Sequence, residues 1–322
     1  MLYPLKFKPI LEERIWGGHQ LGEKMGKKLP TGKLIGESWE ISSVPGNISV
    51  ISNGKLAGNT LEELIEVYMG DLVGDKIYNK FGLLFPLLIK LIDAQDALSI
   101  QVHPNDQLAK ERHNSYGKTE MWYIVDAEQD AQLCLGFNRP VTKEEYLKHV
   151  ADGTLADILA RVPVKQDDAY FIPAGAIHAI GKGILIAEIQ QTSDITYRVF
   201  DWNRVDKNGK SRELHTELAV DAINFAPDQH YDITHQPEVN RSVNLVECPY
   251  FTTNVVEVKG ELTRSYEALD SFVIYMVLDG DLTMKWKDGS EKATKGETVL
   301  VPACIDEMTL EGNAKLLEIF ID

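Results

Sequence analysis

Short apolar runs bounded by Gly, Pro, Asn or Asp make up most of the chain. Examples are residues 171–172 before Pro173, residues 183–191, and residues 273–278 before Asp279-Gly280. Runs of this length between turn residues are typical of β-strands. The pattern therefore predicts a mainly β protein.

Apolar residues recur with helical spacing in only a few segments. The main ones are residues 60–69, 142–150 and 155–160. Thr60 and Thr142 suit helix N-caps, because Glu63 and Glu145 follow them three residues later. We expect a few helices appended to a β scaffold.

The polar stretch at residues 226–241 lacks both periodicities and predicts a domain boundary. Beyond it, residues 278–282 and 295–302 each have the pattern of a strand, a tight turn and a second strand. We therefore expect two domains: residues 1–236 with helical insertions, and residues 237–322 as a small β domain.

Polar side chains share one face of a predicted strand at residues 98–104. Strand alternation sends Ser99, Gln101 and His103 to that face and the apolar residues between them to the other. A half-exposed strand with its polar side in solvent explains this segment equally well.

Charged residues begin a second, otherwise apolar strand, where Lys118 and Glu120 share a face. Buried ionised groups are unfavourable unless they are paired or bind a metal, so either a structural salt bridge or a metal site explains them. A third strand ends in a Pro-x-Gly turn that places His178 just beyond it. Two histidines and a carboxylate suit zinc, whereas spacing alone does not select Gln101 as a further ligand.

Two more charged residues interrupt apolar strands. Lys90 lies in the apolar run at residues 85–92, either facing a pocket or reaching the surface from an edge strand. Glu188 lies in residues 183–190, and Asp194 and Arg198 follow on the same face if that strand continues.

Composition and net charge limit the classes of molecule that the protein is expected to bind. The 322-residue chain carries a formal net charge of −16, which disfavours nucleic acid and anionic membranes, although a few focused Lys and Arg residues still allow an anionic substrate. The N-terminus lacks signal-peptide features, and we expect a cytoplasmic protein. Three scattered cysteines favour reduced thiols, so histidines and carboxylates must bind any metal. The cysteines are Cys134, Cys248 and Cys304.

Four motifs occur in order along the chain. They are Ser-Ile-Gln-Val-His-Pro at 99–104, Gly-Lys-Thr-Glu-Met-Trp-Tyr at 117–123, Pro-Ala-Gly-Ala-Ile-His-Ala at 173–179, and Glu-Ile-Gln-Gln-Thr-Ser-Asp-Ile-Thr-Tyr-Arg at 188–198. Ile15-Trp16-Gly17-Gly18 and Glu37-Ser38-Trp39-Glu40 extend the pattern toward the N-terminus. In these motifs the chain resembles the type I mannose-6-phosphate isomerases, especially the short bacterial form.

The resemblance implies cupin-type jelly-roll barrels, a bicupin, with a few appended α-helices. It also implies a sugar-phosphate substrate, a monomer or weak homo-oligomer, and one Zn²⁺ per chain. The implied zinc ligands are Gln101, His103, Glu120 and His178. Residues 299–305 echo the first Pro-x-Gly turn without its glycine and histidine, so we expect the second barrel to bind no zinc and to support the first by packing.

The implied reaction interconverts mannose 6-phosphate and fructose 6-phosphate through an enediol, which requires an electrophile and a base. Zinc would act as the electrophile, and Glu188 and Lys118 are both candidate bases. The resemblance implies a catalytic role for Arg198, and its permanently charged guanidinium suits stabilisation of an enediolate. Arg204 stands where the family has a basic residue associated with phosphate. The expected contacts to phosphate or hydroxyl groups are Lys90, Ser99, Asp194 and Arg204.

Two other functions fit parts of the pattern. A cupin metalloenzyme of another class, such as an Fe(II) dioxygenase, shares the barrel and the His/Glu ligands. The nearby Lys and Arg residues favour a phosphorylated substrate over an apolar one. A non-catalytic sugar-phosphate-binding cupin would lack a metal ligand or Arg198, and this chain retains all of them.

Overall fold

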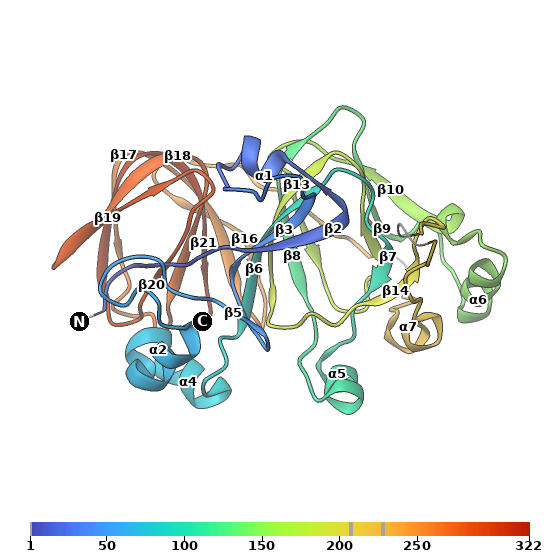
Figure 1. Ribbon diagram of the computed structural model, residues 1–322, viewed down its shortest axis with the longest axis horizontal. Coiled ribbons are helices and arrows are strands. Elements are labelled where there is room, and N and C mark those ends of the chain that lie inside the picture. Colours follow the sequence, from blue (N-terminus) through green and yellow to red (C-terminus); the bar gives the residue numbers. More distant parts are fainter. Residues whose placement is uncertain (1, 206–208, 227–228) are drawn as a thin grey trace.

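The structure is a computed structural model that describes residues 2–205, 209–226 and 229–322. Two β units lie side by side, with helices at their periphery (Figure 1). The helices are α1 (Gln20–Glu23), α2 (Leu61–Tyr68), α3 (Gly70–Val73), α4 (Asp75–Phe81), α5 (Asp106–His113), α6 (Lys143–Ala151) and α7 (Thr216–Ala222).

The described residues form three main antiparallel sheets and one small one. In sheet order, the first has β15 (Asp232–Ile233), β11 (Ala169–Ile172), β8 (Glu120–Ala127), β13 (Ile184–Gln191), β6 (Leu87–Ala94), β3 (Ile35–Ile41) and β2 (Ile10–Gly18). The second has β10 (Leu159–Pro163), β9 (Gln132–Phe137), β12 (His178–Ile180), β7 (Ile100–Val102) and β14 (Tyr197–Phe200).

The third main sheet belongs mostly to the C-terminal unit. Its order is β1 (Leu5–Lys6), β20 (Thr298–Val301), β18 (Val273–Trp286), β21 (Glu307–Phe320), β17 (Thr252–Ser265) and β16 (Ser242–Glu247), with β19 (Gly289–Thr294) beside β18. The small sheet pairs β4 (Ser43–Val44) with β5 (Asn47–Ile48). The prediction of a mainly β protein is confirmed. Strand β1 shows that the N-terminus also contributes to the C-terminal sheet.

Both faces of the central strands β6 and β13 of the first sheet are buried. On β6, Ile89 and Leu91 point toward a core shared with residues of the C-terminal sheet such as Leu317. Ile92 points the other way, into a second core between the first two sheets. The polar residue Lys90 shares the inner face with Ile92, because neighbouring strand side chains alternate. The inner face of this sheet therefore carries both apolar core and functional side chains.

Helices cover the ends and the outer surface of the sheets (Figure 1). Apolar residues of α2, α3 and α4 join the shared core. The backbone N–H groups of Ala303 and Cys304 donate to the carbonyls of Leu72 and Asp71, so the turn at residues 302–305 docks on α3. Helices α6 and α7 pack on the outer face of the second sheet.

Two of the three predicted helices are confirmed. Thr60 caps α2 in a reciprocal capping box with Glu63, and the Thr142 side chain accepts from the Glu145 N–H at the start of α6. The helix predicted at residues 155–160 is wrong. A single 3₁₀ turn, Leu155–Ile158, leads directly into β10, because Leu155, Ile158 and Leu159 pack together into the core under the second sheet.

The turn predicted at residues 278–282 is also wrong. Strand β18 runs through Asp279-Gly280 without interruption, and a β-bulge after Val277 absorbs one extra residue. Gly280 has φ of +75°, and a Cβ there would lie 2.0 Å from the Asn313 carbonyl oxygen. Glycine at this position therefore allows the backbone to form the bulge, and it does not mark a turn. The turn predicted within residues 295–302 is confirmed between β19 and β20.

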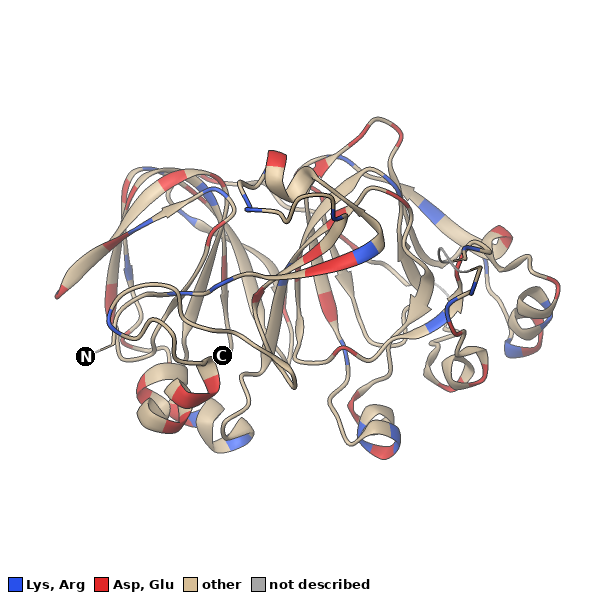
Figure 2. Ribbon diagram, viewed as in Figure 1, with Lys and Arg blue, Asp and Glu red and all other residues tan. Residues whose placement is uncertain are grey.

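Several helices escaped prediction. In α5 only Ala109 is buried, so this helix has no apolar stripe. Acidic and basic residues are interspersed over both units, without a one-sided basic face in this view (Figure 2). Within the described ranges, none of the helices has the length and apolarity needed to span a bilayer.

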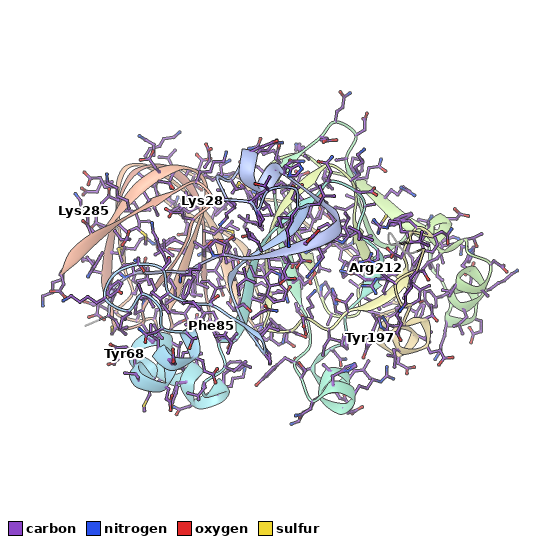
Figure 3. The ribbon with its side chains drawn as sticks, viewed as in Figure 1. Lys28, Tyr68, Phe85, Tyr197, Arg212 and Lys285 are labelled. Atoms are coloured by element: carbon purple, nitrogen blue, oxygen red, sulfur yellow. The ribbon has the colours of Figure 1, made fainter. Side chains whose placement is uncertain are left out.

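The shared core predicts that the two units unfold together. Phe272 in the C-terminal unit is fully buried, and its ring centroid lies 4.6 Å from that of Phe85, which is labelled in Figure 3. We expect Phe272→Ala to lower the free energy of unfolding by about 3–5 kcal/mol and to leave one cooperative transition in chemical denaturation.

Val239→Ala is the control, because that side chain is 46% exposed and its loss is expected to change the free energy by less than about 0.5 kcal/mol. Two separate transitions, of which Phe272→Ala shifts only one, would contradict a shared core.

Candidate metal centre and active-site pocket

Three buried side chains converge between the first two sheets. His103 follows β7, Glu120 begins β8, and His178 begins β12 directly after the Pro-x-Gly turn. One potential ligand atom from each lies within 4.8 Å of the others. The His103 Nε2 atom is 3.3 Å from Glu120 Oε1, and the His178 Nε2 atom is 3.9 Å from Glu120 Oε2. This spacing suits a single metal ion.

Both imidazoles direct an unprotonated nitrogen toward the carboxylate. The Nδ1–H of His103 donates to the Ile195 carbonyl at 2.8 Å, and that of His178 donates to the Ala176 carbonyl at 2.9 Å. Because a carbonyl only accepts, each Nδ1 carries the proton and each Nε2 keeps its lone pair. Burial, together with the neighbouring Lys118 cation, lowers the pKa of His103 well below its usual value. Burial likewise lowers the pKa of His178.

Glu120 is a fully buried carboxylate with unused acceptor capacity. Within the described part of the chain, its Oε2 atom has no hydrogen-bond partner. The Lys118 ammonium lies 2.7 Å from Oε1 and forms an ion pair with it. Burial alone would raise the pKa of Glu120, but nearby cations, Lys118 first among them, outweigh burial and the pKa is lowered. An ionised carboxylate with free lone pairs beside two neutral imidazoles is a fitting donor set for a metal.

Gln101 lies beside this cluster by strand register. It pairs with His178 on one neighbouring strand and with Arg198 on the other. Its Nε2 atom lies 3.2 Å from His178 Nε2, where the imidazole lone pair accepts. The carboxamide therefore reaches the same point as the three convergent side chains.

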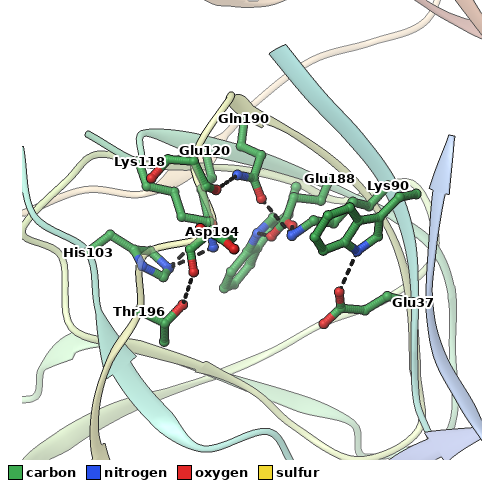
Figure 4. Close-up of polar contacts among 12 residues, drawn as sticks. Glu37, Lys90, His103, Lys118, Glu120, Glu188, Gln190, Asp194 and Thr196 are labelled. Carbon is green, nitrogen blue, oxygen red and sulfur yellow. Dashed lines mark hydrogen bonds and ion pairs between the residues drawn. The ribbon is translucent and has the colours of Figure 1, made fainter. Parts of the chain in front are cut away.

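A cross-strand row of charged and aromatic side chains lies next to the metal-capable group. The Lys90 ammonium lies 2.9 Å from Glu188 Oε2 and 2.7 Å from Gln190 Oε1 (Figure 4). The other Glu188 oxygen accepts from Trp122 Nε1 at 2.9 Å. The Lys90 ammonium also lies 5.4 Å from the centre of the Trp39 ring. Donors thus hold both Glu188 oxygens in a fixed position.

The edge-strand alternative for Lys90 is wrong. Strand β6 is internal to its sheet, and Lys90 is 5% exposed, so its ammonium does not reach bulk solvent. The half-exposed alternative for residues 98–104 is wrong for Ser99 and His103, which are both buried. The salt bridge expected as an alternative for Lys118 and Glu120 is present.

A pocket of ≈ 530 Å³ opens beside these residues. The candidate residues that line it are Lys90, Ser99, Gln101, Lys118, Glu188, Asp194 and Arg198. His103, Glu120 and His178 lie behind Gln101 and Lys118. Arg204 is not among the described lining residues. Its guanidinium donates to the Ala97 carbonyl at 2.6 Å and to the Asp201 carboxylate at 2.7 Å.

Arg198 reaches the pocket by a different route from the expected one. Strand β13 ends at Gln191, and the chain crosses to the second sheet before β14 begins, so the condition that one strand continues to Arg198 is wrong. The Arg198 guanidinium donates to Ser99 Oγ at 3.3 Å and to the Glu213 carbonyl at 3.0 Å. Burial, followed by Arg212, lowers its pKa. Among described residues no carboxylate lies within 4.0 Å, which leaves its charge available to an anionic ligand.

The chain is similar over nearly its whole length to known mannose-6-phosphate isomerases. Residues 4–134 match the model of the phosphomannose isomerase type I catalytic domain, and residues 241–321 match that of the mannose-6-phosphate isomerase cupin domain. The chain is 38% identical to mannose-6-phosphate isomerase ManA of Bacillus subtilis, with 98% of each chain covered. It is 33% identical to a mannose-6-phosphate isomerase of Streptococcus mutans, again over 98% of each.

The chain belongs to the type I mannose-6-phosphate isomerase family.

Solved structures agree with the family's fold. A mannose 6-phosphate isomerase from Bacillus subtilis superposes with a TM-score of 0.89 at 34% identity, covering 99% of both chains. A variant of phosphomannose isomerase from Salmonella typhimurium has a TM-score of 0.82 at 16% identity and shows the shared fold alone. The expected resemblance, the cupin-type fold with appended helices and the isomerase assignment are therefore confirmed.

The pocket of this family member also contains residues that sequence reasoning did not select. They are Glu13, Arg14, Glu37, Trp39, Thr196 and Arg212. Three of them, Glu37, Trp39 and Thr196, lie in noted motifs, which were the available signal. Arg212 lies outside the regular elements and pairs with Asp201 at 2.6 Å, so no local pattern marked it (Figure 3).

The convergent donors predict which variants lose metal. We expect His178→Ala to weaken divalent-metal binding by more than about 100-fold, since even outer-shell changes lower affinity by about 10–100-fold. Arg198→Ala should keep metal binding near the wild-type level, because its guanidinium offers no lone pair. For both variants, metal binding is measured as metal content after gel filtration and by competition with a chromophoric chelator. Equal metal loss in the two variants would contradict the assignment.

Proposed function

We propose that this chain interconverts mannose 6-phosphate and fructose 6-phosphate with one Zn²⁺ ion. The observation that carries the proposal is the buried Glu120 carboxylate, whose Oε2 has no hydrogen-bond partner among the described residues. Two imidazole lone pairs face this carboxylate beside a cation-lined pocket. Two nitrogens and carboxylate oxygen favour zinc among common metals. The proposed ligands are Gln101, His103, Glu120 and His178. Gln101 would bind through its Oε1 atom, which requires a rotation of the carboxamide that exchanges the positions of Oε1 and Nε2.

The bound zinc would supply Lewis-acid polarisation of the sugar oxygens at C1 and C2. Lys118 and Glu188 are proposed to carry the proton transfers between those carbons and oxygens. Both line the pocket: Glu188 lies on β13, and Lys118 lies just before the neighbouring strand β8. The Lys90 and Trp122 donors orient the Glu188 carboxylate, which supports a fixed position for a base.

Arg198 is proposed to stabilise the enediolate electrostatically, since its half-buried guanidinium has no carboxylate within 4.0 Å among the described residues. Lys90, Ser99 and Asp194 are proposed as contacts for hydroxyl or phosphate groups, and all three line the pocket. Arg204 stays a proposed phosphate contact that would have to leave its present bonds, whereas Arg212 already lines the pocket.

The wider organisation is also a proposal. We propose that residues 1–236 form the catalytic unit and residues 237–322 a supporting β unit without metal ligands, with β1 crossing into the latter's sheet. Residues 227–228 of the proposed boundary stretch lie outside the described residues. We further propose a cytoplasmic monomer or weak homo-oligomer that acts on a small sugar phosphate and binds neither nucleic acid nor membranes.

One assay tests the proposed reaction directly. Metal-loaded protein incubated with mannose 6-phosphate should release fructose 6-phosphate, and a chelator should abolish the product until Zn²⁺ is restored. Oxygen uptake, measured in the same reaction, should stay at background. Absence of fructose 6-phosphate, a product that the chelator leaves unchanged, or oxygen consumption with substrate would each reject the proposal.

The role of Arg198 makes a separate prediction. Arg198→Ala should lower kcat by about 100- to 1,000-fold while zinc content stays at the wild-type level, as expected for loss of a donor to developing negative charge. Arg139→Ala is a matched control, because Arg139 pairs with Glu145 on the surface of α6. Turnover by Arg198→Ala that equals the control would exclude this role.

A further inference from the structure

Asp106, in the first turn of α5, binds the segment that leads into β8. Its Oδ1 accepts from the Gly117 backbone N–H at 2.8 Å and from Gln191 Nε2 at 2.9 Å. Gln191 Oε1 then accepts from the Thr119 backbone N–H at 2.9 Å. One carboxylate therefore fixes residues 117–120 directly and through Gln191.

The contact between this segment and α5 is close. A Cβ added at Gly117 would lie 2.6 Å from the Asp106 nitrogen and 2.8 Å from the Asn105 carbonyl carbon. Real Cβ atoms do not approach backbone so closely, so glycine allows the segment to seat on the helix start. Because this contact is tight, a small movement of Asp106 would also move residues 117–120.

The third hydrogen bond to Asp106 comes from the C-terminal unit. The Tyr250 hydroxyl, in the connection between β16 and β17, donates to Asp106 Oδ2 at 2.9 Å. Burial, followed by this hydrogen bond, raises the pKa of Tyr250 to about 12. The hydroxyl therefore keeps its proton and donates throughout the neutral range.

Apolar packing alone does not determine the distance between the two units near Tyr250 and Asp106. Tyr250, Asp106 and Gln191 border a cavity of ≈ 440 Å³ between the two units, separate from the active-site pocket. Where side chains leave such a space, a directional hydrogen bond defines the distance between the two sides better than apolar contact does. The Tyr250–Asp106 bond crosses between the units at this point.

We propose that Tyr250 is a positioning residue, which acts through Asp106 on residues 117–120 and thereby tunes metal affinity and turnover in the first barrel. The proposal rests on the proposed function, in which Lys118 and Glu120 take part. Metal ligands must lie within a few tenths of an ångström of their ideal distance, and a misplacement of about 1 Å lowers catalysis by about 100-fold. The C-terminal unit is then part of the active site's geometry as well as a packing support.

Tyr250→Phe removes only the hydroxyl and is the principal test. We expect about tenfold weaker Zn²⁺ binding in competition with a chromophoric chelator, and about tenfold lower kcat for mannose 6-phosphate with unchanged KM. Tyr123→Phe is the matched control. Its hydroxyl also donates to a carboxylate, Asp167, at 2.9 Å, but Tyr123 faces the shared core on the other side of β8. The control should keep zinc affinity and kcat within about twofold of wild type.

A second variant shows whether Tyr250 acts through Asp106. Asp106→Asn keeps the size of the side chain but replaces one accepting oxygen with a donor, and we expect about 100-fold losses in zinc affinity and kcat. Adding Tyr250→Phe to Asp106→Asn should then change either quantity by less than about twofold, because the two residues share one network. If Asp106→Asn does not fold, the comparison of Tyr250→Phe with Tyr123→Phe decides alone.

The outcomes separate the two proposals. A wild-type chain that neither binds zinc nor forms fructose 6-phosphate rejects the proposed function. An active, zinc-binding wild type with Tyr250→Phe within about twofold of it, or with equal effects of Tyr250→Phe and Tyr123→Phe, overturns the positioning role.

Discussion

The site depends on one buried negative charge, the carboxylate of Glu120. It is fully buried, and its Oε2 atom has no hydrogen-bond partner within the described residues. Such a charge is unfavourable unless cations or a metal compensate it. The Lys118 ammonium provides part of that compensation, and the two imidazoles aim lone pairs at the remaining space. The surrounding strands and turns therefore place one carboxylate and two imidazole nitrogens around a position that suits a cation.

A sheet buried on both faces makes this arrangement possible. Apolar side chains on one face of β6, β8 and β13 pack against the C-terminal unit, while Lys90, Glu120 and Glu188 lie on the other. Register sets Lys90 directly opposite Glu188, so the two charges compensate each other without leaving the interior. The C-terminal unit therefore packs against the outer face of these strands. Its Tyr250 donates to Asp106, and Asp106 in turn accepts from the segment that carries Lys118.

Fold and site tolerate sequence change differently. A structure only 16% identical shares the fold with a TM-score of 0.82, because alternating apolar strands and suitable turns are met by many sequences. The donor set is less tolerant, since it needs two histidines with their Nδ1 protons bound to carbonyls and a carboxylate between them. Relatives with 38% and 33% identity over nearly the whole chain therefore carry the functional inference, while distant structures carry only the architecture.

Sequence alone determined the features that depend on neighbouring residues. Apolar runs between turn residues indicated a mainly β protein, and the capped starts of α2 and α6 were visible because a cap and its partner lie three residues apart. Motifs identified the family and most of the candidate site. Local patterns failed where distant contacts decide: Asp279-Gly280 looked like a turn, but pairing with β21 on one side draws it into a continuous strand.

Only the tertiary structure decided which polar residues meet. It placed Lys90 on an internal strand, brought Arg198 to the pocket across a change of sheet, and added Arg212 from outside the regular elements. It also joined Tyr250 to Asp106 across 144 positions of chain. The physical reason is that alternation along a strand tells which face a side chain takes, whereas register between strands and packing between units decide what that face contacts.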